Sequence, residues 1–415
     1  MRILWVKAGG MVPADTGGRI RSLHILKELA RQHSVTIFTY YAEHFGDQHR
    51  ELRGFADVVA IPIALPPERT PRDYLNYART LFSSEPSSMQ VIGGESGGRL
   101  RYFDSAEIRR RLGSLMAGGN FDALICDFIY PAGLIDWRLP GPKVLFAHNV
   151  EAQLWKQQFE AAHEPLKRFL YWREWRALYE AERRYAGEAD HVVTVSEQNR
   201  AVFANFANPA RVSTITTGVD IDFFQPADCT RSHSMVFTGS MDWMPNQQGI
   251  LFFALEILPH IHAEVPDADL WVVGRYPSRE IQQLAGPRIH VTGRVEDIRP
   301  FLQRAPVYIV PLRSGSGTRI KIFEAMAMGK AVVSTSLGAE GLPVTHGQNI
   351  LIADDPREFA GWVVRVLRDR ELAARLGRAA RLLVEKQFTW KTVASQFEAI
   401  LQDTVGQPVM ARKTA

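Results

Sequence analysis

Short, unbroken runs of apolar residues recur along the whole chain, and stretches with helical spacing lie between them. In the first half of the chain these runs occupy residues 3–6, 35–38, 58–61, 123–126, 144–147 and 191–195. The alternation restarts in the second half, with runs at 235–238, 270–273, 289–292, 307–310 and 331–335. Continuous apolar strands separated by helices are typical of parallel sheets that are covered on both faces. The pattern therefore predicts an α/β protein with two such sheets.

The length of the chain supports the same division. Its 415 residues exceed what one hydrophobic core usually accommodates, so two domains are expected. Hydrophobic residues make up 46% of the chain and charged residues 23%, which leaves enough apolar material for a core in each domain. A polar stretch at 225–234 is expected to be the hinge between them. The Pro-, Ser- and Gly-rich stretch at 62–102 is expected to be an insertion with mobile loops.

Charge, cysteine content and hydropathy exclude several classes of protein. The net charge is only +4 and no basic tract stands out, so nucleic-acid binding is not expected. The two cysteines, Cys126 and Cys229, lie far apart and are expected to be reduced thiols. No apolar run reaches the roughly 18 residues of a membrane span, and the chain opens on a strand pattern. These features predict a soluble, cytoplasmic protein.

The segment 315–329 carries the clearest signal for a binding site. It begins Gly-Ser-Gly-Thr and continues into a helical pattern that holds Arg319, Lys321 and Glu324. A small, flexible turn lets backbone N–H groups gather around an anion, and the start of a helix adds positive potential there. Lys321 and Glu324 are three residues apart and share a helix face. A cation for phosphate beside an acceptor for sugar hydroxyls predicts a nucleotide-sugar site.

Three predicted strands of the second half end in glycine, at Gly239, Gly274 and Gly293. Ligands of open α/β sheets bind beyond the carboxyl ends of the strands, where these glycines are expected to lie. Arg275 directly follows Gly274 and is a further candidate cation for a phosphate.

The first half offers a second set of candidates. Gly17 and Gly18 follow the first strand and precede a helix, and His148 ends a later strand. Arg21, Glu151, Ser196 and Glu197 stand close by in the same pattern. For each of them a structural role stays open, as a plain turn, a core histidine or a residue on a helix surface.

Taken in order, these motifs are similar to those of the retaining glycosyltransferases of the GT-B fold in family GT4. The blocks Gly-Ser-Met-x-Trp-x-Pro-Asn at 239–246 and Gly-x-Gly-Thr-Arg-x-Lys-x-x-Glu-Ala at 315–325 resemble the branch from bacterial exopolysaccharide gene clusters. The resemblance covers nearly the whole chain. It implies two facing Rossmann-like domains with a cleft between them: residues 1–222 for the acceptor and 233–388 for the sugar nucleotide. A helix at 389–405 would return to the first domain, and 406–415 would be a disordered tail.

The resemblance also implies roles for individual residues. Glu324 matches the second glutamate of the family's E-x7-E pattern and would hold the ribose hydroxyls. Ser316 replaces the first glutamate, so its contact with the transferred sugar must be lost, weakened, or made by Ser316 or backbone amides. The expected catalytic residues are His148, Arg319, Lys321 and Glu324. The expected donor site adds Gly239, Ser240, Arg275, Arg294, Gly315, Ser316, Gly317 and Thr318. The expected acceptor and diphosphate loop comprises Gly17, Gly18, Arg21, Glu151, Ser196 and Glu197.

The predicted function is transfer of a hexose from a nucleoside-diphosphate sugar to a hydroxyl acceptor with retention of configuration. A UDP-sugar is the first expectation for the donor and a GDP-sugar the second; the acceptor would be a glycan, a lipid-linked glycan or a small molecule. Two alternatives stay open: a GT-B-type sugar-nucleotide epimerase, and a non-catalytic sugar-nucleotide- or carbohydrate-binding protein.

Two further features bear on cofactors and on location. Asp220 and Asp222 match a D-x-D metal motif only superficially, because their surroundings fit a strand-end turn, and no required metal or cofactor is expected. Residues 166–186 form a helical pattern in which aromatic residues alternate with Arg and Lys. This helix would either pack on its own domain or lie on a membrane surface, giving weak peripheral association with the inner face of the cell membrane.

Overall fold

The computed structural model describes residues 1–14, 16–42, 48–63, 85–89, 91–92, 101–102, 105–226, 233–315 and 319–406. The chain divides into two compact units. The first comprises Met1–Ile215 with Ala394–Ala415, and the second Thr216–Val393. Most of the expected insertion at 62–102, most of the expected hinge and the tail after residue 406 lie outside the described residues.

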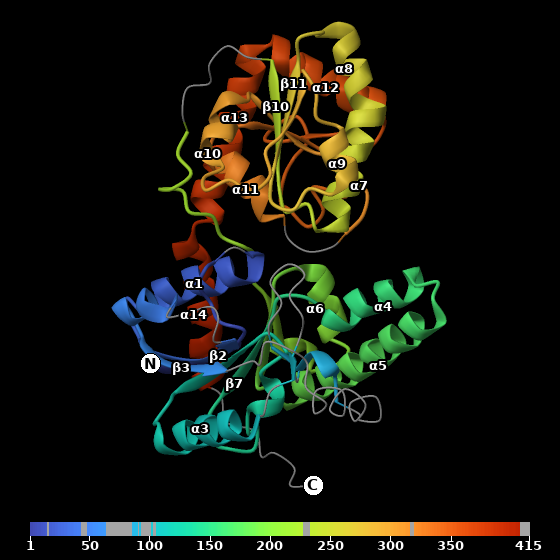
Figure 1. Ribbon diagram of the computed structural model, residues 1–415. Coiled ribbons are helices and arrows are strands. Elements are labelled where there is room, and N and C mark those ends of the chain that lie inside the picture. Colours follow the sequence, from blue (N-terminus) through green and yellow to red (C-terminus); the bar gives the residue numbers. More distant parts are fainter. Residues whose placement is uncertain are drawn as a thin grey trace. The chain divides into compact units, whose positions relative to one another are not determined.

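The first unit is built on a seven-stranded parallel sheet in the order β3-β2-β1-β6-β7-β8-β9 (Figure 1). The strands are β1 (Arg2–Ala8), β2 (Ser34–Ala42), β3 (Asp57–Ile63), β6 (Ala123–Asp127), β7 (Lys143–Ala147), β8 (His191–Thr194) and β9 (Val212–Thr214). A separate antiparallel pair joins β4 (Val91–Ile92) to β5 (Arg101–Tyr102). Every residue of β6 and β7 is buried. Burial on both faces explains why these strands read as continuous apolar runs.

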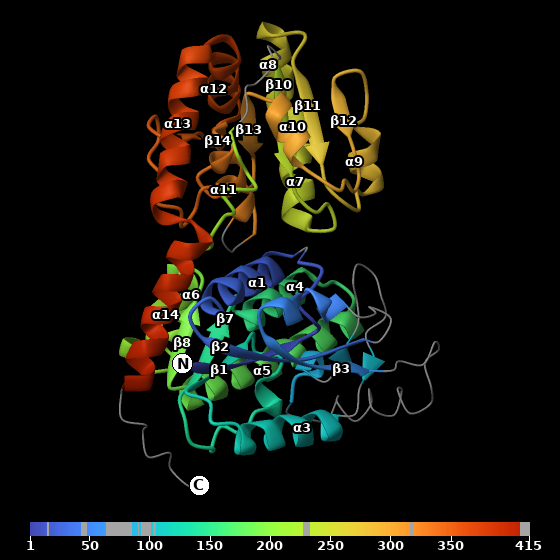
Figure 2. The ribbon, with the colours of Figure 1, turned by 90° about the vertical axis from the view of Figure 1, so that its left-hand side faces the viewer.

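Helices cover both faces of this sheet (Figures 1 and 2). They are α1 (Gly17–Leu29), α3 (Ser105–Gly118), α4 (Glu151–Ala161), α5 (Pro165–Glu188) and α6 (Glu197–Phe203). Short 3₁₀ helices occupy Gln48–Arg50, Leu52–Gly54, Ser87–Met89, Ala132–Leu134 and Pro209–Arg211. Buried residues of α3 and α5 pack with alternate residues of the central strands, such as Leu4 and Leu145.

The last helix, α14 (Trp390–Gly406), supplies part of the first unit's core. The ring of Phe397 lies 5.7 Å from that of Trp5 and 5.1 Å from that of Phe146. Glu398 accepts a hydrogen bond from His33 at 3.0 Å. The return of a C-terminal helix to the first unit is therefore confirmed.

The second unit holds a six-stranded parallel sheet in the order β12-β11-β10-β13-β14-β15. Its strands are β10 (Ser234–Thr238), β11 (Asp269–Val273), β12 (Ile289–Val291), β13 (Val307–Val310), β14 (Ala331–Ser334) and β15 (Leu351–Ile352). Its helices are α7 (Met244–Phe252), α8 (Leu258–Glu264), α9 (Arg279–Gln283), α10 (Arg299–Arg304), α11 (Ile320–Ala327), α12 (Pro356–Arg368) and α13 (Arg370–Gln387). The expectation of an α/β protein with two parallel sheets is confirmed.

One helix differs from its sequence pattern. The apolar spacing predicted a helix at 251–262, but the helical segment starts at Met244 and passes through a π-helical turn at Phe253–Ile257 before α8. Pro259 has no N–H, and its ring would collide with the carbonyl of residue 255 in a regular α-helix. A wider π turn relieves this conflict.

Within the part of the chain that the structure describes, no helix is long and apolar enough to cross a membrane.

Candidate active site

The carboxyl ends of β10 and β11 approach each other closely because both strands end in glycine. A Cβ atom on Gly274 would overlap the carbonyl of Gly239. A Cβ on Gly239 would lie 2.7 Å from the Asn246 amide nitrogen and 2.8 Å from Lys321 Nζ. Glycine at 239 therefore leaves the room in which the Lys321 ammonium reaches the end of the strand.

Lys321, in the block at 315–325, contacts Asn246 of the block at 239–246. Its Nζ donates to Asn246 Oδ1 at 2.7 Å and lies 4.0 Å above the centre of the Phe237 ring. The Asn246 amide in turn donates to the carbonyl of Ser240 at 2.7 Å. The buried side chains of α11 fix this placement, because Ile322, Phe323 and the following residues pack into the core.

Lys321 and Glu324 lie on the same partly buried side of α11, and burial shifts both groups strongly. The pKa of Lys321 is lowered to about 7, chiefly by burial and also by the nearby Arg319, while Glu324 opposes the shift. The pKa of Glu324 is raised to about 7 because burial outweighs the opposing effect of Lys321. Displaced pKa values of this kind concentrate at functional sites.

Arg319 stands at the start of α11 and holds the preceding turn. Its guanidinium donates to the Gly315 carbonyl at 2.8 Å and lies 5.4 Å from the centre of the Trp243 ring. Gly315 has a φ of 95°, and a Cβ there would lie 2.8 Å from Pro245 and 2.9 Å from Trp243. The glycine thus lets the turn pack against the first block. Ser316, Gly317 and Thr318 lie outside the described residues.

Of two further residues expected in the donor site, Arg275 lies in this group and Arg294 does not. Arg275 Nε donates to Ser240 Oγ at 3.1 Å, and the Arg275 carbonyl accepts from the Met241 N–H at 2.8 Å. Arg294 is exposed after β12, and no contact among the described residues joins it to this group. The structure therefore brings together Gly239, Ser240, Arg275, Gly315, Arg319, Lys321 and Glu324 around the ends of β10 and β11.

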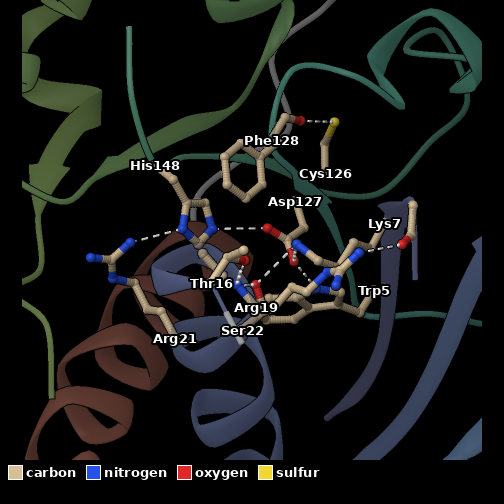
Figure 3. Close-up of polar contacts among 12 residues, drawn as sticks. Trp5, Lys7, Thr16, Arg19, Arg21, Ser22, Cys126, Asp127, Phe128 and His148 are labelled. Atoms are coloured by element: carbon tan, nitrogen blue, oxygen red, sulfur yellow. Dashed lines mark hydrogen bonds and ion pairs between the residues drawn. The ribbon is translucent and has the colours of Figure 1, made fainter. Parts of the chain in front are cut away.

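The first unit carries a buried polar group at the carboxyl ends of three adjacent strands (Figure 3). Asp127 ends β6, Lys7 lies near the end of β1, and His148 follows β7. The Asp127 carboxylate pairs with Lys7 Nζ at 2.9 Å and with His148 Nε2 at 2.8 Å. Burial alone would raise the pKa of Asp127, but Lys7 and His148 outweigh it and hold that pKa well below its usual range.

Both ring nitrogens of His148 are hydrogen-bonded, and one face of the ring is stacked against another side chain. Arg21 Nη1 donates to His148 Nδ1 at 2.9 Å, and the Phe128 ring stacks on the imidazole at 4.0 Å with an interplanar angle of 4°. Burial lowers the pKa of His148 to about 3, so the ring is neutral. Its expected place near the reacting sugar stays a prediction.

Gly18 makes the stacking of Phe128 on His148 feasible. A Cβ on Gly18 would lie 2.5 Å from the Phe128 ring. Phe128 itself has a φ of 67°, a conformation that non-glycine residues rarely adopt. Gly17 opens α1 beside it, with Thr16 as N-cap.

The remaining candidates of the first half have local partners. Glu151, the first residue of α4, accepts from Tyr130 at 2.7 Å, and burial raises its pKa. Ser196 caps α6 by accepting from the Asn199 N–H at 3.2 Å, and Glu197 pairs with Arg200 at 3.5 Å. Among the described residues none of these three contacts His148 directly, although Tyr130, the partner of Glu151, stacks on Phe128.

Sequence reasoning missed Lys7, Asp127 and Phe128, and it found Trp243 and Asn246 as members of the block at 239–246 without giving them a role. Lys7 and Asp127 carried a usable signal, because each is a charged residue at the end of an otherwise apolar strand. Their meeting across β1 and β6 needed the strand order, which one sequence does not supply.

Residues 16–223 match the family described as Glycosyltransferase Family 4, and residues 232–369 match the family described as Glycosyl transferases group 1. The fold resembles that of Anabaena Alr3699/HepE in complex with UDP, with a TM-score of 0.65, 14% identity and coverage of 97% of this chain and 100% of that one. Together these likenesses define the class, a glycosyltransferase of the GT-B fold. The chain belongs to glycosyltransferase family 4.

Two curated relatives align with parts of the chain. An uncharacterized 44.6 kDa protein in the cps region of Klebsiella pneumoniae is 21% identical over 303 residues, which cover 69% of this chain and 76% of that protein. A GDP-mannose-dependent alpha-(1-6)-phosphatidylinositol monomannoside mannosyltransferase of Mycobacterium tuberculosis is 28% identical over 248 residues, 53% of this chain and 63% of that protein. The chain spans about half the length of the mycobacterial phosphatidyl-myo-inositol mannosyltransferases that it matches.

Proposed function

We propose that this chain transfers a hexose from a nucleoside-diphosphate sugar to a hydroxyl acceptor with retention of anomeric configuration. The observation that carries the proposal is the group at the ends of β10 and β11, where Arg319 and Lys321 place two cations beside Glu324. A departing nucleoside diphosphate gains negative charge in the transition state, so fixed cations there lower the barrier. Removing one such donor typically costs about 2.7–4 kcal/mol.

The division of labour follows from the chemistry of each side chain. Lys321 and Arg319 hold the diphosphate, and the ionised Glu324 carboxylate accepts hydrogen bonds from two ribose hydroxyls. A retaining route with a covalent intermediate needs a carboxylate nucleophile at the reacting sugar. Glu324 is assigned here to the ribose hydroxyls, so we propose that the acceptor attacks on the face that the diphosphate leaves. The leaving phosphate oxygen then takes the acceptor proton.

The donor is proposed to be a UDP-sugar, with a GDP-sugar second. The first choice is supported by the likeness to a structure that holds UDP, and the second by a relative whose name specifies GDP-mannose. The acceptor, bound by the first unit, is proposed to be a glycan or a lipid-linked glycan, since the relative named above acts on a phosphatidylinositol monomannoside.

We place the enzyme in the cytoplasm with weak attachment to the membrane surface. The start of α5 exposes Leu166, Phe169 and Trp172, with exposed fractions of 70%, 49% and 43%. Lys167 and Arg168 stand between them, so an apolar surface with basic neighbours would face the lipid.

The decisive experiment is anomer analysis of the product by NMR. The protein is incubated with UDP- or GDP-hexoses and a set of glycan and lipid-linked acceptors, and the new linkage must keep the donor's configuration. Inversion would overturn the retaining mechanism. The same donors without acceptor test the alternatives: an epimerised sugar nucleotide identifies an epimerase, and nucleotide binding without transfer or hydrolysis identifies a binding protein. Lys321→Met is the matched inactive control.

A further inference from the structure

A single line of buried groups runs through the first unit from Asp127 through His148 to Arg21 (Figure 3). Asp127 Oδ2 accepts from the Trp5 indole at 2.8 Å and from Lys7 Nζ at 2.9 Å. Its other oxygen, Oδ1, faces His148 Nε2 at 2.8 Å. Three donors therefore fix one carboxylate, which is fully buried.

The partners of His148 dictate its tautomer. An ionised carboxylate only accepts hydrogen bonds and a guanidinium only donates them. Nε2 must therefore carry the proton that Asp127 accepts, and Nδ1 must be bare to accept from Arg21. A proton on Nδ1 would point at the Arg21 donors. Both ring nitrogens are thus engaged, and the imidazole acts as a neutral bridge rather than as a group that exchanges protons with a substrate.

Arg21 is a buried cation whose charge is not neutralised by contact. Only 4% of its surface is exposed, and its guanidinium donates a hydrogen bond to the neutral His148. Nε is buried without a hydrogen-bond partner, and no ion pair joins Arg21 to a carboxylate among the residues that the structure describes. Asp127, beyond the imidazole, is already paired with Lys7. Burying a guanidinium without a paired anion costs folding free energy, and a bound anion would offset that cost.

We infer that Asp127 is a positioning residue: by holding His148 in the Nε2–H tautomer it orients Arg21, which receives an anionic group of the ligand, a phosphate or a carboxylate. The inference rests on the proposed function, in which both the donor diphosphate and an acidic or phosphorylated acceptor can supply such a group. The stacked Phe128 ring and Gly18 keep the imidazole plane in place while Asp127 sets which nitrogen is protonated.

The variant Asp127→Asn separates positioning from packing because it keeps the shape of the side chain. Its single carbonyl oxygen is claimed by two donors, Trp5 and Lys7, so its amide N–H₂ faces His148 Nε2. That nitrogen must then accept, the proton moves to Nδ1, and Nδ1–H faces the Arg21 donors. His148→Gln is the rescue variant, since one side-chain amide offers both an N–H for Asp127 and an oxygen for Arg21; His148→Ala offers neither.

The test combines a spectroscopic and a binding readout on the full chain. In ¹⁵N-labelled protein, the His148 signal is identified by its loss in His148→Gln; the wild type should show the Nε2–H pattern and Asp127→Asn the Nδ1–H pattern. Titrations with UDP and with inorganic pyrophosphate, and the acceptor KM, then locate the anion. Arg21→Gln and Asp127→Asn should each either lower the affinity for UDP and pyrophosphate or raise the acceptor KM, by at least tenfold. In the same measurements His148→Gln should stay closer to the wild type than His148→Ala.

The outcomes assign the source of the anion or overturn the inference. Weaker UDP and pyrophosphate binding places the donor diphosphate at Arg21, and a raised acceptor KM alone places an acidic acceptor there. An Nδ1–H or charged His148 in the wild type overturns the inference, as does a change below threefold in all three quantities with variants that melt as cooperatively as the wild type. The tautomer and the titrations with UDP and pyrophosphate need no turnover, so an absence of sugar transfer would count against the proposed function, and the inference would then be judged on these two readouts.

Discussion

At the scale of single residues, Gly18 decides whether His148 can be stacked. Gly18→Ala places a Cβ against the Phe128 ring, whose backbone is already at a φ of 67° and cannot easily withdraw. Overpacking of this kind costs about 1–3 kcal/mol, so we expect lower stability of the first unit in urea unfolding. Gly113→Ala in α3 is the control: its Cβ meets open space, and the change should stabilise by up to about 1 kcal/mol. Equal unfolding midpoints for the two variants would contradict this account.

Lys321 and Glu324 predict how nucleotide binding depends on pH. A bound diphosphate raises the Lys321 pKa above its free value of about 7, so affinity falls as pH rises through 7 and binding takes up a proton. Ribose hydroxyls favour the ionised Glu324, whose free pKa is also about 7, so affinity falls as pH drops below 7 and binding releases a proton. Affinity should peak near pH 7 and fall by at most about tenfold per pH unit on either side.

Calorimetry in buffers of different ionisation enthalpy checks this prediction. UDP or GDP binding should release a net of up to about 0.8 proton at pH 6 and take up a similar amount at pH 8. Glu324→Gln should abolish the release and keep the uptake. Binding without proton exchange at both pH values would show that these two groups do not meet the nucleotide.

At the scale of elements, α14 is expected to stabilise the first unit through the ring of Phe397. Phe397 is fully buried against Trp5 and Phe146, and Phe397→Ala should cost about 3–5 kcal/mol. Amide hydrogen exchange in β1 and β7 should accelerate accordingly. Leu382→Ala on α13, at a side chain that is 54% exposed, should change stability by no more than about 0.5 kcal/mol. Unchanged exchange in β1 and β7 would show that α14 is dispensable for this unit.

The helices and strands differ in how far they could be predicted from the sequence alone. Strands such as β6 and β7 were predictable because burial on both faces leaves an apolar run, and α5 because its pattern is long. The three-residue β9 and two-residue β15 were not, since so few residues hold no periodicity. In the site, Lys321 and Glu324 were found from local spacing on one helix. The Asp127 network was missed because it joins residues more than a hundred positions apart through strand order.

At the scale of the whole molecule, we predict that the protein binds lipid membranes through the exposed start of α5. The helices α4 and α5 lie side by side (Figure 1), held by Trp155 against Tyr171 and Phe159 against Trp175. This packing leaves Leu166, Phe169 and Trp172 exposed, and burying such side chains in a membrane interface contributes about 1.5–3 kcal/mol each at most. Replacing all three by Ser should weaken sedimentation with phosphatidylglycerol-containing vesicles by at least about tenfold.

The charges near α5 set a limit on the electrostatic part of this attachment. Lys167 is paired with Glu164 at 2.7 Å and Lys156 with Glu160 at 3.7 Å, which leaves Arg168 and Arg176 as the cations for anionic lipid. Binding should therefore weaken only moderately with salt, because the apolar side chains provide most of it. The control is Leu255→Ser with Leu382→Ser, two comparably exposed leucines of the second unit at 67% and 54%. If that control lowers vesicle binding as much as the α5 variant does, the attachment is unspecific and α5 is not the surface that meets the membrane.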